Sequence, residues 1–398
     1  MIKRSKYLSQ LIDFRDTDLI KVITGVRRSG KSVLLMQYRD YLLSTDVPEK
    51  SIIYINMEAF EYQNIQSQED FSQLLQSKIN SKESTYYILI DEIQFVSGWQ
   101  RVINSVRVSY NCDIVITGSN AQLLSGELAS LLGGRYVEIP VYPFSFKEFL
   151  TSKQIDLSET RKLDQAYLEY EQFGGFPSVV LSQASIKDTI LSGIFDSIVL
   201  HDIAFRGEVQ DTQVLKSIIG FLADNVGQLV NPNKIANVLT SEGLKTNNKT
   251  VSRYIELLEN AFLFYKTSNY DMRGKQYLRT QAKYFIVDNG LRRHAVGKKG
   301  ANFGNRLENI VHMELKRRGY DISVGRLDQQ EIDFIARKFD DLLYVQVAYD
   351  LPDSNRETDN LLLIKDNYQK IIITGRYQDT HEIDGIEVKY IVDWLLEQ

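Results

Sequence analysis

The sequence predicts a doubly wound α/β fold built on a parallel sheet. Short apolar runs, each about the length of one strand, recur through the first 145 residues, and longer segments with helical spacing separate them. Strands that are apolar along their whole length are typical of a parallel sheet that helices cover on both faces. A glycine-rich loop lies between the first apolar run and the first helical segment, where a strand would turn into a helix.

The strands of this first part follow from the apolar runs. Residues 32–43 and 71–79 have the spacing of helices with one buried face. The expected strands are residues 19–24, 51–56, 86–90, 114–117 and 136–139.

After Pro143 the pattern becomes mainly helical, and it returns to alternating strands only near the end. We therefore expect a core at 1–145, a helical lid at 146–210, a helical module at 211–285 and a second α/β domain at 286–398. A length of 398 residues is typical of about two to four domains.

The composition limits the class of protein. Hydrophobic residues make up 43% and charged residues 25%, which is the balance of a folded globular protein. No run of about 18 apolar residues exists, so we expect no membrane span. The single cysteine, Cys112, excludes an internal disulfide and fits a reducing cytoplasm. A net charge of −5 requires any nucleic-acid contact to come from a local basic surface.

The glycine-rich loop matches a nucleotide-binding motif. The segment from Gly25 to Ser32 fits G-x-x-x-x-G-K-[ST], the Walker A pattern, with a strand before it and a helix after it. Backbone N–H groups of such a loop wrap phosphates, so ATP is the expected ligand. Lys31 is expected to contact the β- and γ-phosphates, and the Ser32 hydroxyl to bind Mg²⁺. The expected nucleotide contacts are Gly25, Arg27, Arg28, Ser29, Gly30, Lys31, Ser32 and Val33.

A second motif ends the third expected strand. The run 86–90 is followed by Asp91 and Glu92, the arrangement called Walker B. We expect Asp91 to hold Mg²⁺, directly or through water, and Glu92 to be the base that activates the attacking water. A solvated turn is the alternative interpretation of such a pair, but the neighbouring Walker A motif disfavours it.

Two further polar residues are candidates for catalysis. Asn120 follows the fourth strand, where it would sense the γ-phosphate, and Thr117 and Ser119 are less favoured for that role. Asn120 can also cap a helix, and the two roles are compatible. Arg135 precedes the fifth strand and is either an arginine finger, in cis or supplied to a neighbouring subunit, or a surface arginine. The trans alternative leaves an oligomer open.

The order of these motifs resembles a family of prokaryotic AAA+ ATPases. The resemblance rests on residues 25–32, 89–94 and 117–120, and it continues through the stretches 143–149, 174–177 and 283–290. It implies an ATP-binding core, a helical lid, a winged-helix segment and a nuclease-like C-terminal fold of unassigned role. No N-K-x-D pattern follows the sensor strand, which disfavours guanine nucleotides.

The middle of the chain has helix-turn-helix spacing. Helices are expected at 232–239 and 250–261, with a glycine-containing turn between them. Lys245, Lys249 and Arg253 would stand at the start of the second helix, and a hairpin with Arg273 and Lys275 would form the wing. Double-stranded DNA is therefore a candidate partner of 234–275 and of the C-terminal domain. A helical packing module with solvated lysines is the alternative.

The C-terminal domain resembles PD-(D/E)xK nucleases. A helix glutamate, Glu308, and a strand aspartate, Asp333, stand at the matching positions. Gln346 replaces the second acid and Ala348 replaces the lysine that such enzymes use with their metal. The resemblance thus implies a retained fold that binds DNA or a protein without cutting it. The alternative interpretation of Glu308 and Asp333 is a polar pair at a strand edge.

Three functions compete on this basis. The first is Mg²⁺-dependent ATP hydrolysis that drives a conformational switch, with DNA as a candidate target. The second is an ATP-stabilised module that binds a protein partner with little turnover. The third and least favoured is an ATP-gated, metal-dependent nuclease.

Overall fold

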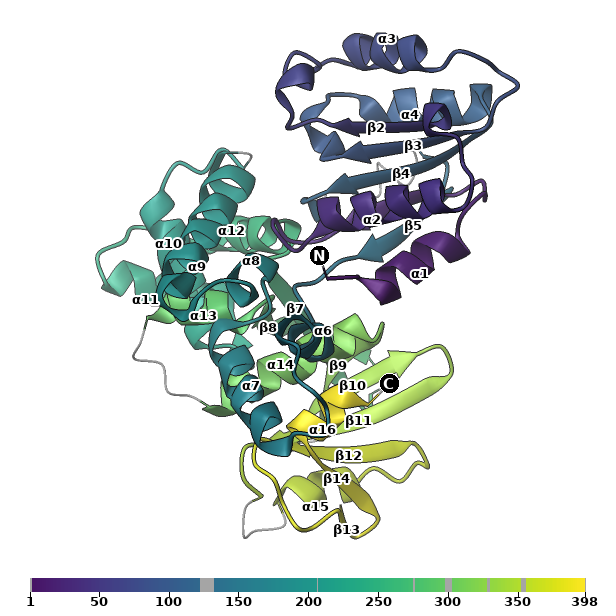
Figure 1. The fold of residues 1–398 in the computed structure, drawn as a ribbon. Coiled ribbons are helices and arrows are strands. Elements are labelled where there is room, and N and C mark those ends of the chain that lie inside the picture. Colours follow the sequence, from purple (N-terminus) through teal and green to yellow (C-terminus); the bar gives the residue numbers. More distant parts are fainter. Residues whose placement is uncertain are drawn as a thin grey trace. The chain divides into compact units, whose positions relative to one another are not determined.

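The described part of the chain forms two compact units. The structure is a computed structural model, and it describes residues 2–121, 132–205, 207–274, 276–297, 303–327, 330–351 and 356–397 (Figure 1). The first unit consists of Met1–Tyr142 with Asn260–Phe262. The second unit consists of Pro143–Glu259 with Leu263–Gln398. None of the described helices is both long and apolar enough to cross a membrane.

A parallel sheet organises the first unit, as the apolar runs predict. Its strand order is β2-β3-β4-β1-β5, and every pairing in it is parallel. Each strand lies within two residues of its predicted range, so these predictions are confirmed. The strands are β1 (Ile20–Thr24), β2 (Ile52–Asn56), β3 (Tyr86–Asp91), β4 (Cys112–Gly118) and β5 (Tyr136–Pro140).

Helices cover both faces of this sheet (Figure 1). Ile88 and Ile90 of β3 pack into the core on the side of α3 (Gln68–Lys78) and α4 (Trp99–Ser109). Leu89, between them, packs into the opposite core with α1 (Ser5–Asp13) and α2 (Lys31–Ser44). Because successive side chains of a strand point to opposite faces, both faces must be apolar, which explains the continuous apolar runs. The described part of this unit also contains the short 3₁₀ turns η1 (Glu49–Ser51), η2 (Phe60–Tyr62) and η3 (Ile93–Phe95).

The second unit begins with helices, as the sequence predicts. α6 (Phe146–Lys153) starts with a capping box between Ser145 and Glu148. The helices and helical turns that follow are α7 (Thr160–Phe173), α8 (Pro177–Val180), η5 (Ala184–Ile186), α9 (Lys187–Ser197), the π-helix η6 (Ile198–Phe205), α10 (Thr212–Asp224), α11 (Pro232–Ser241), α12 (Asn248–Asn260), α13 (Asn289–Val296), α14 (Phe303–Arg317), α15 (Arg356–Leu362) and α16 (Ile391–Leu396).

A nine-stranded mixed sheet runs through the second unit in the order β13-β14-β12-β11-β10-β9-β7-β8-β6. The strands predicted at 331–336, 342–348 and 370–374 are confirmed as β10, β11 and β12. The bounds are β6 (Leu229–Val230), β7 (Phe264–Asp271), β8 (Gln276–Ile286), β9 (Asp321–Leu327), β10 (Gln330–Lys338), β11 (Asp341–Ala348), β12 (Gln369–Thr374), β13 (Glu382–Ile383) and β14 (Ile386–Tyr390).

This sheet corrects the predicted domain boundary at 285/286. β7 pairs in parallel with β9, with Asn269 opposite Val324, so one sheet joins the predicted helical module to the predicted C-terminal domain. The sequence indicates the β7–β8 hairpin but not what pairs with its outer edge. An unpaired edge exposes backbone donors and acceptors, and here β9 covers it. The segments 146–210, 211–285 and 286–398 thus contribute to a single unit rather than three.

Candidate nucleotide-binding site

The loop between β1 and α2 has a backbone that requires glycine. Gly25 has φ 139°, and a Cβ there would lie 2.1 Å from the carbonyl oxygen of Val141. Gly30, the N-cap of α2, has φ 103°. Glycine is the residue that adopts such angles without strain. The loop therefore closes tightly around the start of α2, and it leaves the helix N-terminus as a site for an anion.

Lys31 is the buried cation of this loop. Its side chain is only 2% exposed, and its Nζ donates to the carbonyl oxygens of Gly25 at 3.1 Å and Val26 at 3.2 Å. The same Nζ lies 3.8 Å from Oε1 of Glu92. The ammonium group of the first motif and a carboxylate of the second are thus neighbours, as the two motifs predict.

Asp91, at the end of β3, is held between two hydroxyl groups. Thr117 Oγ1 donates to Asp91 Oδ1 at 2.5 Å, and Ser32 also forms a hydrogen bond with this carboxyl group. Burial raises the pKa of Asp91, while the hydrogen bonds from Thr117 and Ser32 work against that rise. A carboxylate beside a serine hydroxyl is an all-oxygen ligand set of the kind that Mg²⁺ prefers, so these residues fit the ion.

Glu92 is fixed from several sides. Its backbone lies in the left-handed region at φ 54°, and its N–H donates to Thr117 Oγ1 at 2.9 Å. The side-chain amide of Gln94 donates to Glu92 Oε2 and lies 3.4 Å from Ser119 Oγ. Thr117 therefore contacts both acidic residues, although the sequence favoured Asn120 as the polar residue of this strand. Asn120 follows β4 at the same edge of the sheet.

Arg4 is a contributor to the site that the sequence analysis missed. It is 1% exposed, and it donates to the carbonyl oxygens of Ser29 at 2.9 Å and Tyr142 at 2.8 Å. Its guanidinium group lies 4.8 Å from the ring centre of Tyr7. Arg4 thus links the backbone of the glycine-rich loop, at Ser29, to the segment after β5, at Tyr142. Only its basic character signals this role in the sequence, because its partners are backbone carbonyls far along the chain.

The remaining residues of the Walker A motif lie around the loop. Arg27 pairs with Glu58 at 2.6 Å on the surface, and Arg28 is exposed with φ 66°. The Ser29 hydroxyl is buried and has no hydrogen-bond partner within the described residues. Val33, in the first turn of α2, is 37% exposed. The loop residues can therefore contact a nucleotide mainly through their backbone, as predicted for this motif.

Arg135 lies at the amino-terminal ends of the parallel strands, whereas the Walker residues lie at their carboxyl ends. It immediately precedes β5, and its Nη1 pairs with Asp18, which precedes β1, at 3.0 Å. The Walker A loop follows the other end of β1, about 15 Å away at ~3.3 Å per residue. This position, at the other end of its own parallel strands, disfavours a role for Arg135 in cis. A role in trans stays a prediction.

The predicted nuclease-like residues do come together in the second unit. Glu308 lies on α14, Asp333 on β10 and Gln346 on β11. The backbone N–H of Asp333 donates to Gln346 Oε1 at 3.3 Å, and that of Val347 donates to Asp333 Oδ2 at 2.8 Å. Asp333 and Gln346 thus lie side by side on neighbouring strands, and the nuclease-like role of these residues stays a prediction.

A lysine that the sequence analysis missed lies among these acids. Lys283 of β8 lies 3.0 Å from Glu308, 2.7 Å from Glu331 and 3.9 Å from Asp333. Burial acts to lower the pKa of Lys283, but the three carboxylates together raise it. Burial, with the charge of Glu308, raises the pKa of Asp333 to about 8. No cluster of His, Cys, Asp and Glu within the described ranges could hold a metal ion, so the acids do not fit a nuclease metal centre.

The basic residues of the helix-turn-helix segment are on the surface. Lys245 precedes α12 and Lys249 lies in its first turn, and both are exposed. Arg253 is exposed but donates to the carbonyl oxygen of Gly207 at 2.7 Å. Arg273 lies in the turn between β7 and β8, while Lys275 is outside the described residues.

Comparison with known proteins agrees with the P-loop class of nucleotide-binding domain that the first unit and its Walker motifs indicate. Residues 17–150 match the family model described as an AAA domain. Residues 164–302 match a model described only as a domain of unknown function.

Close relatives cover almost the whole chain. An uncharacterized protein of Haemophilus influenzae is 66% identical over 397 residues, which cover 100% of this chain and 99% of that protein. An uncharacterized protein of Methanocaldococcus jannaschii is 30% identical over 367 residues, with 89% of this chain and 80% of that protein covered. The chain belongs to the family of these two proteins.

Solved structures show only a distant likeness. Cdc6p of Pyrobaculum aerophilum is 12% identical, with a TM-score of 0.30 over 78% of this chain and 95% of that one. At such a score the likeness supports no statement about function.

Proposed function

We propose that this chain binds ATP with Mg²⁺ and hydrolyses it. The observation that carries the proposal is the meeting of Lys31, Asp91 and Glu92 at the carboxyl edge of one parallel sheet, with Lys31 Nζ 3.8 Å from Glu92 Oε1. Ligands of open α/β sheets bind at this edge. Bound Mg²⁺ would neutralise charge on the β- and γ-phosphate oxygens.

Each residue of the site has a role in this proposal. Lys31 exchanges its contacts with the carbonyl oxygens of the loop for phosphate oxygens, and Ser32 and Asp91 hold the ion. Glu92 orients a water molecule and accepts its proton. Thr117 fixes both acidic residues, since it donates to the carboxyl group of Asp91 and accepts from the backbone N–H of Glu92. Asn120 is the proposed contact of the γ-phosphate.

We propose further that hydrolysis drives a conformational switch that acts on DNA. The element order α10, β6, α11, α12, β7, β8 is that of a winged helix, with Lys245 and Lys249 exposed at the start of α12. Lysines at that position contact phosphates of the duplex. Binding should therefore weaken as salt rises, and Lys245→Gln with Lys249→Gln should reduce the salt dependence.

The test is steady-state ATP hydrolysis with and without duplex DNA. Glu92→Gln should lower turnover by roughly 10²-fold or more while ATP binding, measured separately, persists. Glu49→Gln makes the same carboxylate-to-amide change at an exposed position of the same unit, and it should leave turnover unchanged. DNA should accelerate the wild type.

Other results would favour the second candidate. Equal and negligible turnover by wild type and Glu92→Gln, with tight ATP binding by both, would contradict the proposed hydrolysis. ATP would then serve to stabilise a surface for a protein partner. The third candidate, a nuclease, finds no support in the ion-paired acids around Lys283.

A further inference from the structure

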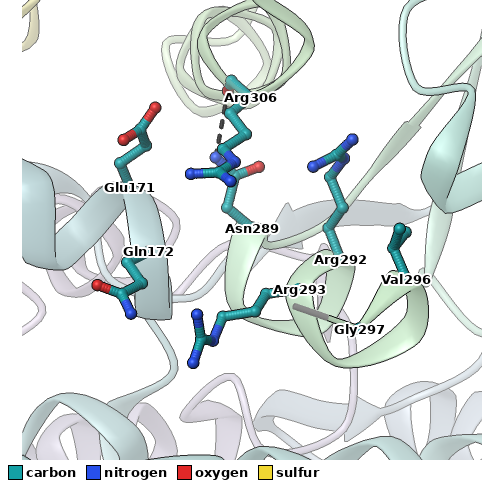
Figure 2. Close-up of a pocket in the computed structure, with 8 residues that line it drawn as sticks. All are labelled: Glu171, Gln172, Asn289, Arg292, Arg293, Val296, Gly297 and Arg306. Carbon is teal, nitrogen blue, oxygen red and sulfur yellow. Dashed lines mark hydrogen bonds between the residues drawn. The ribbon is translucent and has the colours of Figure 1, made fainter. Parts of the chain in front are cut away.

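A pocket in the second unit is lined by an unusual number of arginines. It lies among α7, α13 and α14 (Figure 2). Almost all of its lining belongs to the segment that matches the domain of unknown function. The lining residues are Glu171, Gln172, Asn289, Arg292, Arg293, Val296, Gly297 and Arg306.

Arg292 is buried in this pocket with unused hydrogen-bond donors. It is 2% exposed, yet nothing in the described part of the chain accepts a hydrogen bond from its Nε or Nη2. A buried donor without an acceptor costs about 1–3 kcal/mol, and more for a charged group. Burial and the nearby charge of Arg306 both lower the pKa of Arg292. A guanidinium group nevertheless stays charged in proteins. The carboxylates of Asp224 and Glu171 favour that charge from nearby, but neither accepts a hydrogen bond from Nε or Nη2.

The lining of the pocket carries three arginines and one carboxylate. Arg306 extends from α14 and Arg292 from α13 into the space between these helices (Figure 2). Glu171 contributes the one carboxylate of the lining, and Arg293 pairs with Asp188 at 3.2 Å. The side-chain amide of Asn289 donates to the carbonyl oxygen of Arg306 at 3.1 Å, which fixes the first turn of α14 beside the pocket. An anion between Arg292 and Arg306 would relieve their mutual repulsion.

The size of the pocket limits the anion. Its volume is about 30 Å³. A cavity needs roughly 10–15 Å³ to hold one water molecule, so this space admits a small tetrahedral anion but not a base or a sugar. Guanidinium groups bind phosphate and carboxylate in pairs of parallel hydrogen bonds. The unsatisfied Nε and Nη2 donors of Arg292 match the oxygens of such an oxyanion.

We propose that this pocket binds phosphate, as the inorganic ion or as the terminal phosphate of a larger ligand. Arg292 supplies Nε and Nη2 as a fork, and Arg306 supplies the second positive charge. Neither residue belongs to the ATP site, so this proposal is independent of ATP hydrolysis.

Calorimetric titration of the full-length protein with inorganic phosphate tests the site. Because the Walker A loop also binds phosphate, Lys31→Ala is titrated alongside the wild type. We expect a phosphate-binding event that survives Lys31→Ala and weakens at least about tenfold in Arg292→Met. Arg318→Met removes an arginine just after α14 that pairs with Glu314 at 3.0 Å and does not line the pocket, and it should keep that event.

Thermal unfolding separates a binding role from a structural one. Without phosphate, Arg292→Met should melt at or above the wild-type temperature, because the substitution removes two buried donors that have no acceptor. Phosphate should then raise the melting temperature of the wild type but not of the variant. Arg306→Gln provides a second variant with the same expected loss of phosphate response.

Oligonucleotides with and without a 5′-phosphate identify the source of the anion. Displacement of inorganic phosphate from Lys31→Ala by the phosphorylated form alone assigns the pocket to a terminal phosphate. Binding of inorganic phosphate without such displacement assigns it to the free ion. Phosphate titrations that are the same for Lys31→Ala and for Lys31→Ala combined with Arg292→Met would overturn the proposal.

Discussion

At the scale of single residues, Thr117 shows how one hydroxyl group can organise a catalytic site. Its Oγ1 donates to Asp91 and accepts from the backbone N–H of Glu92, and the whole side chain is buried. The proposed metal ligand and the proposed base thus share one anchor. Such an anchor affects turnover by positioning and does not itself touch the reacting atoms.

Thr117→Val should impair hydrolysis more than ATP binding. Valine keeps the shape but leaves the Glu92 N–H without an acceptor, which should cost about 1–3 kcal/mol of stability. We expect turnover to fall roughly tenfold or more, since the position of Glu92 is no longer fixed. Thr117→Ser should restore most of it. Thr151→Val removes an exposed hydroxyl that bonds within its own helix, and should change neither quantity. Equal turnover by Thr117→Val and wild type would show that Thr117 has no positioning role.

Arg135 offers a second test at this scale. Its exposed pair with Asp18 is worth about 0–1 kcal/mol, so Arg135→Ala should barely change stability. We expect ATP hydrolysis within about twofold of wild type if the residue acts only on its own surface. A loss of about 10³-fold with unchanged ATP affinity would instead reveal delivery to a neighbouring subunit.

At the scale of elements, Asp288 connects two distant segments. It caps α13 by accepting from the N–H groups of Gly290 at 2.8 Å and Leu291 at 3.3 Å. It also accepts from the N–H of Gly175 at 2.7 Å, which ties the turn after α7 to α13. Burial raises the pKa of Asp288 to about 6, although these three N–H groups favour the charged form.

This shift predicts a pH dependence with a definite sign. In the unfolded chain the pKa of an aspartate is ~3.9, so between pH ~4 and ~6 the folded state holds a proton that the unfolded state releases. Stability from this group is therefore highest below pH ~4, falls by about 3 kcal/mol as pH rises to ~6, and is constant above that. Asp288→Asn should lack this fall. Free energies of unfolding of both proteins between pH 4 and 7 measure the difference, and parallel curves would contradict it.

Elements built from local pattern were predictable, and contacts between distant elements were not. The five strands of the first sheet and the Walker motifs follow from apolar runs and from residues that are neighbours in sequence. Lys283, by contrast, reaches Glu308 and Asp333 from a strand that the sequence assigned to another domain. Arg4 binds backbone carbonyls, which carry no side-chain signal at all.

At the scale of the whole molecule, the second unit should fold only as one piece. A fragment of residues 286–398 lacks β7, the partner of β9, and lacks Lys283, so Glu308 would be buried without its cation. Removing one partner of a buried ion pair costs about 3–5 kcal/mol. We expect this fragment to be unfolded or aggregated, and residues 143–398 to fold. Circular dichroism and amide NMR spectra decide the matter, and a dispersed NMR spectrum from 286–398 would contradict the prediction.

The pairing of β7 with β9 also has a consequence for how such proteins diversify. Gene rearrangements that exchange modules succeed where the exchanged stretch carries its own hydrogen-bond partners. A crossover near codon 286 would separate a strand from its neighbour and a lysine from its acids. Lineages should therefore inherit the two halves of this sheet together, as one cassette, and swap them only as a whole.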